Sequence, residues 1–573
     1  MQTGATTTSS QVVHALPPAP NRYRADLSLQ ALLRRHLEGE AREWLDPLLD
    51  LGGDDAAHRL DELAALADRH PPVLHARDRF GNRVDRLEFH PAYEELRRAS
   101  YGRGLIGHYH DPELRALLGA GREVAKFAQG YLFAQAEQGL YCPICLTDGT
   151  AFLVERYGSD DQKARWLPHL VSTRMEDLWE GAMFLTERAG GSDVGATETV
   201  ARRAPDGTWR LEGEKWFCSN ARADLAMVLA RPEGAGPGTR GLGLFAMRLR
   251  RDDGTPNGLR LDRLKDKLGT RSMATAELVL EDAVAEPLGD LSRGFVQMAD
   301  MLNLSRLYNS VAALAVARRA LTDALAWCRT RRAFGRPLVG FPAVRETLAG
   351  RAVELEGAMH LVFGALARRG RVLVGPSGPD DEALLRLLTP LAKYSTARLA
   401  VATATEAMEL LGGNGYVEDW PLARLTRDAL VLPLWEGAAN ILVLDVFRAM
   451  RRDHADQAFF REVGRHGHLA EATHQLQASL PGIAAEVAER GGSPHAGRWC
   501  DRALQVLQAA WLADAAADEG SGIATAGDRE GTAGGRARAM AEAWWLRHFD
   551  PRRHDLVPPH SAFLQDGYEM LTD

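Results

Sequence analysis

The sequence predicts a mainly helical α+β fold, with a small β domain between two helical domains and a further helical domain at the C-terminal end. Apolar residues recur with a period of about 3.6 before residue 180 and after residue 292, which is typical of amphipathic helices. Between these regions, short apolar runs are separated by turn residues, which is typical of strands. A chain of 573 residues also exceeds the usual domain size of about 100 to 200 residues and therefore predicts several domains.

The N-terminal part divides into a lead-in and a helical domain. Residues 1–22 are rich in Thr, Ser, Ala and Pro and lack periodicity, which predicts a flexible segment. Residues 23–180 contain repeated helical patterns, such as Glu113–Glu137 and Ala151–Leu170, broken by Pro and Gly clusters. We therefore predict an all-helical N-terminal domain.

Residues 181–291 have the pattern of a β domain. Four runs bounded by turn residues are predicted to be strands: Trp209–Cys218, Leu225–Ala230, Leu242–Met247 and Glu277–Leu280.

Long helical patterns return over residues 292–450 and predict an antiparallel bundle. The patterns are Phe295–Arg329, Phe341–Arg369 and, after a loop at Gly375–Pro379, Asp381–Leu411. Residues 451–573 form a predicted appended helical domain, interrupted by the Gly-rich stretch Glu519–Gly535, which we expect to be a loop or a disordered insert.

Composition excludes several classes of protein. No apolar run reaches the ~18 residues of a membrane span, and Met1–Ser10 lacks the features of a secretory signal, so we expect a cytoplasmic protein. Five cysteines are few and odd in number, which argues against a disulfide framework. The net charge of −8 disfavours a nucleic-acid partner, and residues 451–573 hold 13 Arg and no Lys against 18 Asp and Glu.

The first segment with chemical character is Leu185–Asp193, at the start of the predicted β domain. It offers main-chain N–H groups and the hydroxyls of Thr186 and Ser192 at a domain junction. These groups suit the polar edge and the phosphates of a bound cofactor. The alternative is a capped turn that only leads into the β domain.

A second segment, Glu409–Tyr416, ends the third long helical pattern with the sequence Glu-Leu-Leu-Gly-Gly-Asn-Gly-Tyr. Glycines here allow a ligand to approach the backbone closely. No strand precedes them, so the segment is not a Rossmann loop. The alternative is a glycine that only ends the helix.

The third segment, Leu434–Asn440, carries Glu436 in an apolar stretch beside Trp435. Burial in such a stretch raises the pKa of a carboxylate, which suits a base that works near neutral pH. The alternative is a buried glutamate with a structural role only.

In this order and spacing the three segments resemble signatures of the acyl-CoA dehydrogenase superfamily. The resemblance implies FAD as cofactor, Glu436 as catalytic base, and a fold with an N-terminal helical domain, a β-barrel-like middle domain and a four-helix bundle. Ala438 stands where the family has Thr, and Glu409 where many members have Gln. The cofactor contacts that it implies in these segments are Leu185, Thr186, Gly191, Ser192, Glu409, Leu410, Gly412, Gly413, Ala438 and Asn440.

Two further segments extend the resemblance. Trp216-Phe217-Cys218-Ser219 is similar to the β-domain run that stacks against the flavin, which implies cofactor contacts by Trp216 and Ser219; the alternative is a core strand. Arg331-Arg332-Ala333-Phe334-Gly335 resembles the turn through which one subunit reaches the FAD diphosphate of its neighbour; the alternative is a solvated basic turn. A guanidinium binds phosphate with two hydrogen bonds, so Arg331 suits that task and, with Phe334, implies a homotetramer.

Fragments in the N-terminal domain are similar to the AidB-like branch of the superfamily. They are His70-Pro71-Pro72, Phe89-His90-Pro91-Ala92 and Cys142-Pro143-Ile144. We expect Cys142 to begin a helix that lines the substrate pocket, the alternative being a redox or metal site with Cys145. His108, His110 and Asp111 are expected in a surface loop, the alternative again being a metal site. The substrate-binding residues that the resemblance implies are Cys142, Thr147, Asn303, Arg306 and Trp435.

Two hypotheses about function follow from the resemblance. The first is an FAD-dependent dehydrogenase or oxidase that acts on an acyl thioester or on a small non-CoA compound with a C–N or N–N bond. Its electron acceptor would be an electron-transfer flavoprotein or O₂. Asn303 replaces the acidic half of the family's CoA-contacting pair, whereas Arg306 keeps the cationic half. The second hypothesis is a DNA-associated protective flavoprotein of the alkylation response, as the AidB-like fragments imply.

Overall fold

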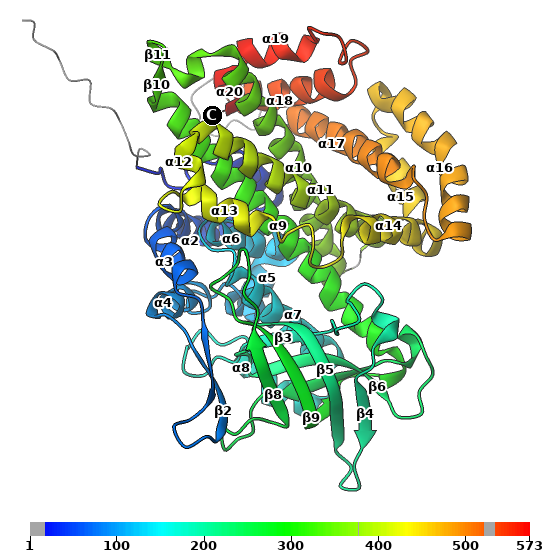
Figure 1. The fold of residues 1–573 in the computed structure, drawn as a ribbon. Helices are drawn as coiled ribbons and strands as arrows, with labels where there is room; N and C mark the ends of the chain where they lie inside the picture. Colours follow the sequence, from blue (N-terminus) through cyan, green and yellow to red (C-terminus); the bar gives the residue numbers. More distant parts are fainter. Residues whose placement is uncertain (1–17, 376, 521–532, 573) are drawn as a thin grey trace, which may run out of the picture.

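The computed structural model describes residues 18–375, 377–520 and 533–572 (Figure 1). Most of the predicted lead-in (1–22) and of the predicted insert (Glu519–Gly535) lies outside these residues.

The N-terminal region is mainly helical. Its helices are α1 (Leu27–His36), α2 (Gly39–Ala57), α3 (Arg59–Arg69), α4 (Pro91–Ser100), α5 (Pro112–Leu118), α6 (Arg122–Ala136), α7 (Tyr141–Tyr157) and α8 (Asp160–Leu170). Each of the two helical patterns noted in the sequence is divided. The first breaks at Gly119, where φ is +47°, and the second breaks at Gly158, after which Ser159 begins α8 with a capping box.

The prediction of an all-helical N-terminal domain was wrong, because β1 (Val73–Arg77) and β2 (Arg83–Glu88) form an antiparallel hairpin. Leu74 and Leu87 of the hairpin pack against the core of the middle sheet, and Asp85 accepts a hydrogen bond from the backbone of Leu261. The hairpin therefore gains its apolar partners from residues nearly two hundred positions away, which no local pattern reveals.

A seven-stranded sheet forms the middle of the molecule. Its strands are β3 (Gly181–Phe184), β4 (Val200–Arg203), β5 (Trp209–Ser219), β6 (Leu225–Pro232), β7 (Gly243–Arg248), β8 (Leu259–Leu264) and β9 (Thr275–Pro287). Strands pair in the order β3-β6-β4-β5-β9-β7, and an additional β6–β7 pairing closes a ring. The four predicted strands and the barrel-like form are confirmed, whereas β3, β4 and β8 were not predicted.

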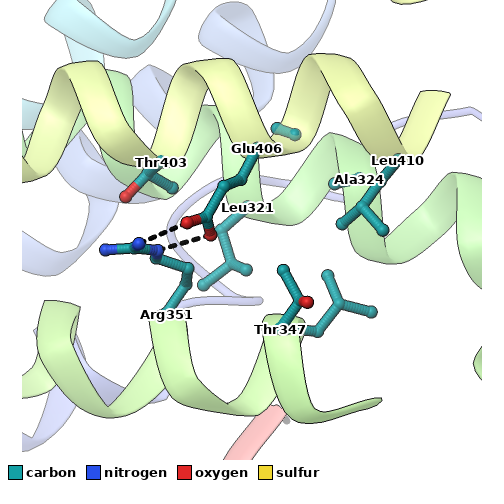
Figure 2. A pocket seen from close by; sticks show the side chains of 9 residues that line it. Leu321, Ala324, Thr347, Arg351, Thr403, Glu406 and Leu410 are labelled. Carbon is teal, nitrogen blue, oxygen red and sulfur yellow. Dashed lines mark hydrogen bonds and ion pairs between the residues drawn. The ribbon is translucent and has the colours of Figure 1, made fainter. Parts of the chain in front are cut away.

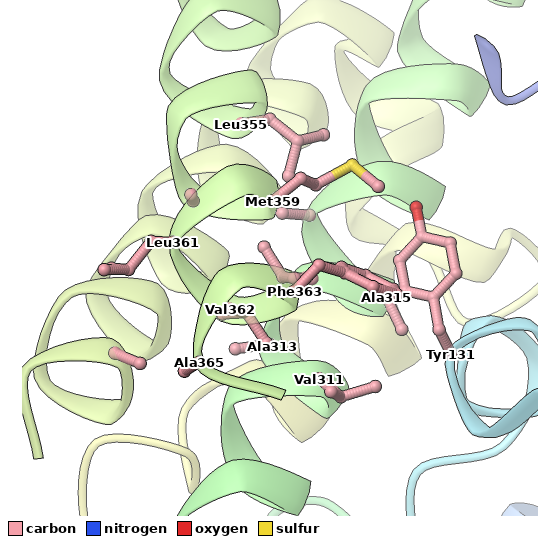
Figure 3. Packing of buried hydrophobic residues seen from close by; sticks show 14 of the residues in the cluster. Tyr131, Val311, Ala313, Ala315, Leu355, Met359, Leu361, Val362, Phe363 and Ala365 are labelled. Carbon is pink, nitrogen blue, oxygen red and sulfur yellow. The ribbon is translucent and has the colours of Figure 1, made fainter. Parts of the chain in front are cut away.

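The third region is a bundle of long helices. It contains α9 (Gly294–Thr330), α10 (Pro342–Val374) and α11 (Pro379–Leu411), as predicted, followed by α12 (Gly413–Tyr416), α13 (Pro421–Ala429) and α14 (Ala439–Asp453). Figure 3 shows the core where α6 meets α9 and α10, with Tyr131 beside Val311, Met359 and Phe363. One continuous core therefore joins the N-terminal helices to the bundle.

The C-terminal region packs against α10. It consists of α15 (Ala455–Val463), α16 (Ala470–Arg490), α17 (Ala496–Gly520), α18 (Ala533–His548), α19 (Pro559–Asp566) and α20 (Tyr568–Thr572). Two glycines of α10 allow the close contact, since a Cβ at Gly357 would lie 2.7 Å from the Trp544 ring and one at Gly364 would lie 2.6 Å from the Trp511 ring. These aromatic rings fix the appended region to the bundle.

Candidate active site

Glu436 lies in a strained turn between α13 and α14. Its φ is +58°, a left-handed conformation that is unfavourable for a residue with a side chain, and Gly437 follows with φ of +106°. A non-glycine residue keeps such a conformation only where the surroundings impose it. Contacts with the surrounding residues must therefore hold Glu436 in this conformation.

The Glu436 side chain is directed to the start of α7 and to α9. Desolvation raises the pKa of Glu436, while hydrogen bonding with Ser305 of α9 opposes the rise. The hydroxyl of Ser305 also lies 3.2 Å from the Cys145 thiol, and the charge of Glu436 contributes, after burial, to the raised pKa of the Cys142 thiol. Because Cys142 stands near the start of α7, as predicted, two thiols, a hydroxyl and a carboxyl converge at one place.

Arg306 supports the turn rather than facing open solvent. Its Nε donates to the Glu436 carbonyl oxygen at 3.2 Å, and its Nη1 donates to Asp445 at 2.6 Å and to Asn303 at 3.0 Å. The predicted pair Asn303 and Arg306 therefore does meet, but the carboxylate that neutralises Arg306 comes from Asp445 of α14.

Two side chains at this turn were missed by sequence analysis. Ser305 carries no sequence signal, and Lys393, in the middle of α11, donates from Nζ to the Gly437 carbonyl oxygen at 2.7 Å. Lys393 directly follows the mostly apolar stretch Leu387–Ala392, and a lysine at such a position was the sign that the sequence offered.

The segments predicted to hold the flavin ring come together beside the sheet. The Trp216 backbone N–H donates to the Thr186 carbonyl oxygen at 2.9 Å, so β5 and the Leu185–Asp193 segment are adjacent. The indole of Trp216 is half-buried beneath Lys265, whose Nζ lies 3.5 Å from the ring centroid. Ser219, at the end of β5, hydrogen-bonds with Cys142 and so connects this surface to the base.

Glu187 anchors the Leu185–Asp193 segment. Its carboxylate accepts hydrogen bonds from the Glu198 and Thr199 backbone N–H groups, from the Thr199 hydroxyl and from Lys215 Nζ at 2.7 Å. Desolvation opposes ionisation, but the charge of Lys215 and these hydrogen bonds hold the pKa of Glu187 below its ordinary value. Gly191 and Ser192 are left exposed on the anchored loop.

The residues predicted to reach the ADP half lie elsewhere. Arg331 ends α9, and Phe334, on the β10–β11 turn (Arg332–Ala333 and Arg336–Pro337), is 97% exposed with φ of +50°. Figure 1 places this turn at the end of the bundle away from the sheet. One chain therefore does not bring Arg331 and Trp216 together.

The end of α11 is exposed in the same half of the molecule. A Cβ added at Gly412, where φ is +64°, or at Gly413 would meet no atom of the described residues within 4 Å, so this backbone is open to a ligand. Figure 2 shows the Arg351–Glu406 ion pair that ties α10 to α11, with Leu410 farther along α11 beside Ala324. Glu409 is exposed, as are Ala438 and Asn440 at the start of α14.

Thr147 and Trp435, both predicted to bind substrate, differ in their hydrogen bonds. The Thr147 hydroxyl donates to the Pro143 carbonyl oxygen and accepts from the Gly181 N–H, so it links α7 to β3. The Trp435 indole N–H is buried and has no acceptor among the described residues. It is thus a free donor beside Glu436.

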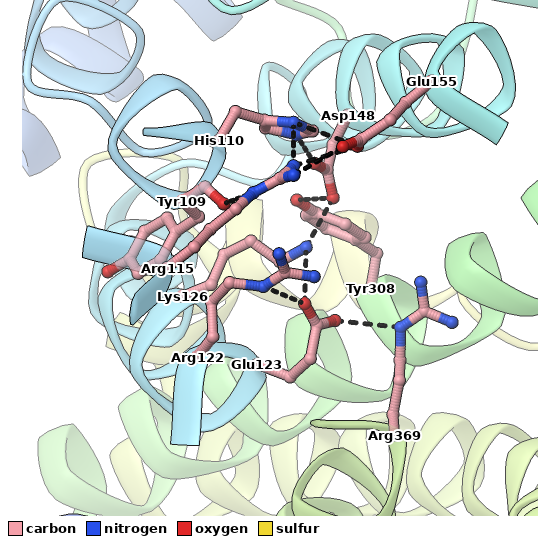
Figure 4. Close-up of polar contacts among 10 residues, drawn as sticks. All are labelled: Tyr109, His110, Arg115, Arg122, Glu123, Lys126, Asp148, Glu155, Tyr308 and Arg369. Atoms are coloured by element: carbon pink, nitrogen blue, oxygen red, sulfur yellow. Dashed lines mark hydrogen bonds and ion pairs between the residues drawn. The ribbon is translucent and has the colours of Figure 1, made fainter. Parts of the chain in front are cut away.

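Figure 4 shows a buried polar cluster that includes Asp148 of α7, the helix that also carries Cys142 and Cys145. Asp148 accepts from Lys126 at 2.8 Å and from the Tyr308 hydroxyl at 3.0 Å, and His110 Nε2 lies 3.4 Å away. Although burial opposes it, the charge of Lys126 holds the pKa of Asp148 well below its usual range. The expectation of a surface loop at His110 was wrong, because this cluster covers most of the imidazole. No group of three His, Cys, Asp or Glu in the described ranges is placed to hold a metal ion.

The chain matches three domain families in succession. They are the Adaptive response protein AidB N-terminal domain over residues 17–177, the acyl-CoA dehydrogenase middle domain over 182–283 and the acyl-CoA dehydrogenase C-terminal domain over 292–451. Acyl-CoA dehydrogenase family member 11 of Caenorhabditis elegans is 35% identical over 442 residues, which cover 75% of this chain and 71% of that protein. The chain belongs to the acyl-CoA dehydrogenase family. It is therefore an FAD-dependent oxidoreductase.

Other relatives support this acyl-CoA dehydrogenase assignment. The putative acyl-CoA dehydrogenase AidB of Escherichia coli is 34% identical over 80% of this chain and 84% of its own length. The solved structure of C. elegans ACDH-11 in complex with C11-CoA superposes with a TM-score of 0.86 and 29% identity, covering 100% of this chain and 98% of that one. The appended C-terminal region is thus part of a shared fold.

The residues of the candidate site fit the flavin ring and the diphosphate of FAD, the cofactor of acyl-CoA dehydrogenases. A half-buried indole next to an anchored polar loop suits the ring, and the buried Trp435 N–H is an unused donor next to the base. Open glycine backbone and Arg331, which has no carboxylate partner in the part of the chain that the structure describes, suit a diphosphate.

Proposed function

We propose that this protein is an acyl-CoA dehydrogenase-like enzyme in which Glu436 removes a proton from the carbon next to an activated group. The observation that carries the proposal is the position of Glu436, half-buried with a raised pKa in a left-handed turn at the α7–α9 junction. A base with a raised pKa is well matched to proton removal near neutral pH.

The residues around the turn would have separate roles in the reaction. Arg306 and Lys393 hold the turn, the Glu436 carboxylate takes the proton, and the main-chain N–H of Glu436 polarises the substrate carbonyl oxygen. FAD, when bound, would supply the hydride acceptor for the adjacent carbon. Cys142 and Trp435, both half-buried near Glu436, would line the substrate pocket.

Acyl thioesters are the first substrate class to test, and small C–N or N–N compounds are the second. The C. elegans relative has been solved with C11-CoA, which favours a thioester here. Asn303, beside Arg306, replaces the acidic half of the family's CoA-contacting pair, so the non-CoA class is tested as well. We propose a cytoplasmic enzyme that passes electrons to an electron-transfer flavoprotein or to O₂; no described helix is long and apolar enough to cross a membrane.

The test is anaerobic mixing of the purified holoenzyme with a panel of acyl-CoAs and of free amines, with flavin absorbance as the readout. Bleaching by a thioester supports the first class, and bleaching by an amine alone supports the second. Mass spectrometry of the released cofactor should give FAD. Release of FMN, or no bleaching by any member of a broad panel in either class, contradicts the proposal.

We also propose a homotetramer in which Arg331 reaches the FAD diphosphate of a neighbouring subunit. The separation of the Arg331 end of the bundle from Trp216 supports a contribution from a second chain (Figure 1). The 97% exposed Phe334 next to it is an apolar residue that a neighbour would cover.

Arg331→Ala is expected to lower FAD retention and to loosen the oligomer together, because one contact contributes to both equilibria. Loss of a charge-assisted contact of about 1.5 to 3 kcal/mol corresponds to a tenfold or greater loss of FAD affinity. Flavin content after dialysis and mass by light scattering measure the two effects. Arg332→Ala, on the same turn, is the matched control. If flavin content and mass both stay at wild-type values, Arg331 is a surface residue only.

The alternative function is a DNA-associated protective flavoprotein, as the resemblance of the N-terminal fragments to the AidB-like branch implies. The acidic balance of residues 451–573 opposes it, because duplex binding requires clustered cations against several phosphates. We expect no appreciable shift of a duplex in a gel assay at physiological salt. Affinity that falls steeply between low and moderate salt would instead support the DNA-associated function.

A further inference from the structure

The turn at Glu436 has two consecutive carbonyl groups that each accept a hydrogen bond from a cationic side chain. The Glu436 carbonyl oxygen accepts from Arg306 of α9, and the Gly437 carbonyl oxygen accepts from Lys393 of α11. Each cation approaches from a different helix. Since Glu436 has a φ of +58°, these two contacts oppose the tendency of the residue to leave the left-handed region.

Lys393 differs from the other buried lysines. Lys126 pairs with Asp148, and Lys215 pairs with Glu187, so each of those ammonium groups has a carboxylate partner. Lys393 is fully buried and forms no ion pair with any residue that the structure describes. A buried, unpaired cation destabilises a fold, so packing alone does not account for this residue.

Two charged side chains, Glu436 and Arg306, act on the Lys393 ammonium. Arg306 is neutralised by Asp445, which also pairs with Arg386 of α11. Burial, the largest effect, favours the neutral form of Lys393; the charge of Glu436 favours the charged form, and the charge of Arg306 again favours the neutral form. The net result is a pKa of Lys393 lowered to about 8.

We propose that Lys393 is a positioning residue for the Glu436 base, which holds the Gly437 carbonyl oxygen so that the turn presents the carboxylate and the Glu436 N–H to the substrate. Its charge also favours the ionised form of Glu436. The inference rests on the proposed role of Glu436, but its test uses no substrate, so the two can fail separately.

Backbone hydrogen exchange of residues 431–442 in the FAD-loaded protein measures the first effect. The Leu434 and Leu442 N–H groups are hydrogen-bonded on either side of the turn and report its opening. Lys393→Met is expected to accelerate their exchange about tenfold or more, as for loss of one charge-assisted hydrogen bond. Arg398→Met, which removes an exposed cation from the same helix, should leave exchange unchanged. Lys393→Arg should restore part of the protection.

The protonation of Glu436 measures the second effect. Infrared difference spectra between each protein and its Glu436→Gln partner, taken across pH, isolate the Glu436 carboxyl band. Its midpoint should rise by about one pH unit in Lys393→Met, because a nearby opposite charge has been removed. In the wild type, exchange at the turn, corrected for its intrinsic rate, should rise as pH passes about 8 and Lys393 loses its charge.

Three results would overturn the proposal. The first is an unchanged exchange rate and an unchanged Glu436 midpoint in Lys393→Met. The second is acceleration spread over the whole chain, which would mean a packing role only. The third is the absence of a rise in wild-type exchange near pH 8, which also decides the matter if Lys393→Met does not fold. Loss of substrate turnover in Glu436→Gln is a separate measurement and tests the base itself.

Discussion

Replacement of Glu436 by Gln is expected to remove flavin reduction by substrate while FAD, fold and oligomer remain. The amide is nearly isosteric with the carboxyl group, so packing beside Trp435 is kept and only the basic lone pair is lost. General bases contribute about 10² to 10⁴ in rate, and the loss should lie at the upper end because proton removal starts the only chemical step. Stopped-flow absorbance with the substrate found in the panel measures it.

Reduction by dithionite is the control, because it needs no base and should persist in the Glu436→Gln protein. Bleaching at the wild-type rate with substrate would show that Glu436 is not the base. Asp148 would not be its replacement, since Lys126, Tyr308 and His110 already surround that carboxylate. A basic group on the substrate itself would then be the candidate.

Glu187→Ala is expected to be the most destabilising single change in the middle sheet. It leaves the fully buried Lys215 ammonium without a carboxylate and removes the acceptor of the Thr199 hydroxyl. Breaking a buried ion pair on one side costs about 3 to 5 kcal/mol. Denaturation monitored by tryptophan fluorescence, together with flavin retention, should show the loss, because Lys215 Nζ donates to both Glu187 and the Leu185 carbonyl oxygen of the segment predicted to contact the flavin.

The double variant Glu187→Leu with Lys215→Met separates the causes. Apolar groups in place of both charges often leave stability nearly unchanged, so the double variant should recover most of the loss. Equal instability of the double variant and Glu187→Ala would mean that the ion pair is not the cause. Because the folded-state pKa of Glu187 is lowered, its contribution is present above a pH of about 4.3 and disappears as pH falls through that lowered pKa.

The predicted strands carry strong apolar patterns of their own, whereas two of the missed strands were overlooked despite one: β3 (Gly181–Phe184) is apolar but only four residues long, and β8 (Leu259–Leu264) alternates leucine with charged residues. β5, β6, β7 and β9 are the predicted strands, whereas β4 (Val200–Arg203) presents exposed arginines and exists because β5 and β6 pair with it. The β1–β2 hairpin depends in the same way on the middle sheet. Pairing with residues distant in sequence is a tertiary property, and no local periodicity encodes it.

The candidate site, like the fold, was predicted from the sequence only in part. The sequence by itself determined the order of the regions, the family resemblance and the cofactor, and it predicted Glu436 as the candidate base, because glycine segments, aromatic strands and a carboxylate in an apolar run are local features. Only the tertiary structure decided that Ser305, Arg306 and Lys393 meet at Glu436, that Asp148 is occupied by Lys126, and that Arg331 lies far from Trp216. The physical reason is that hydrogen bonds and desolvation act over a few ångströms in space, and helices from three parts of the chain must pack before those distances exist.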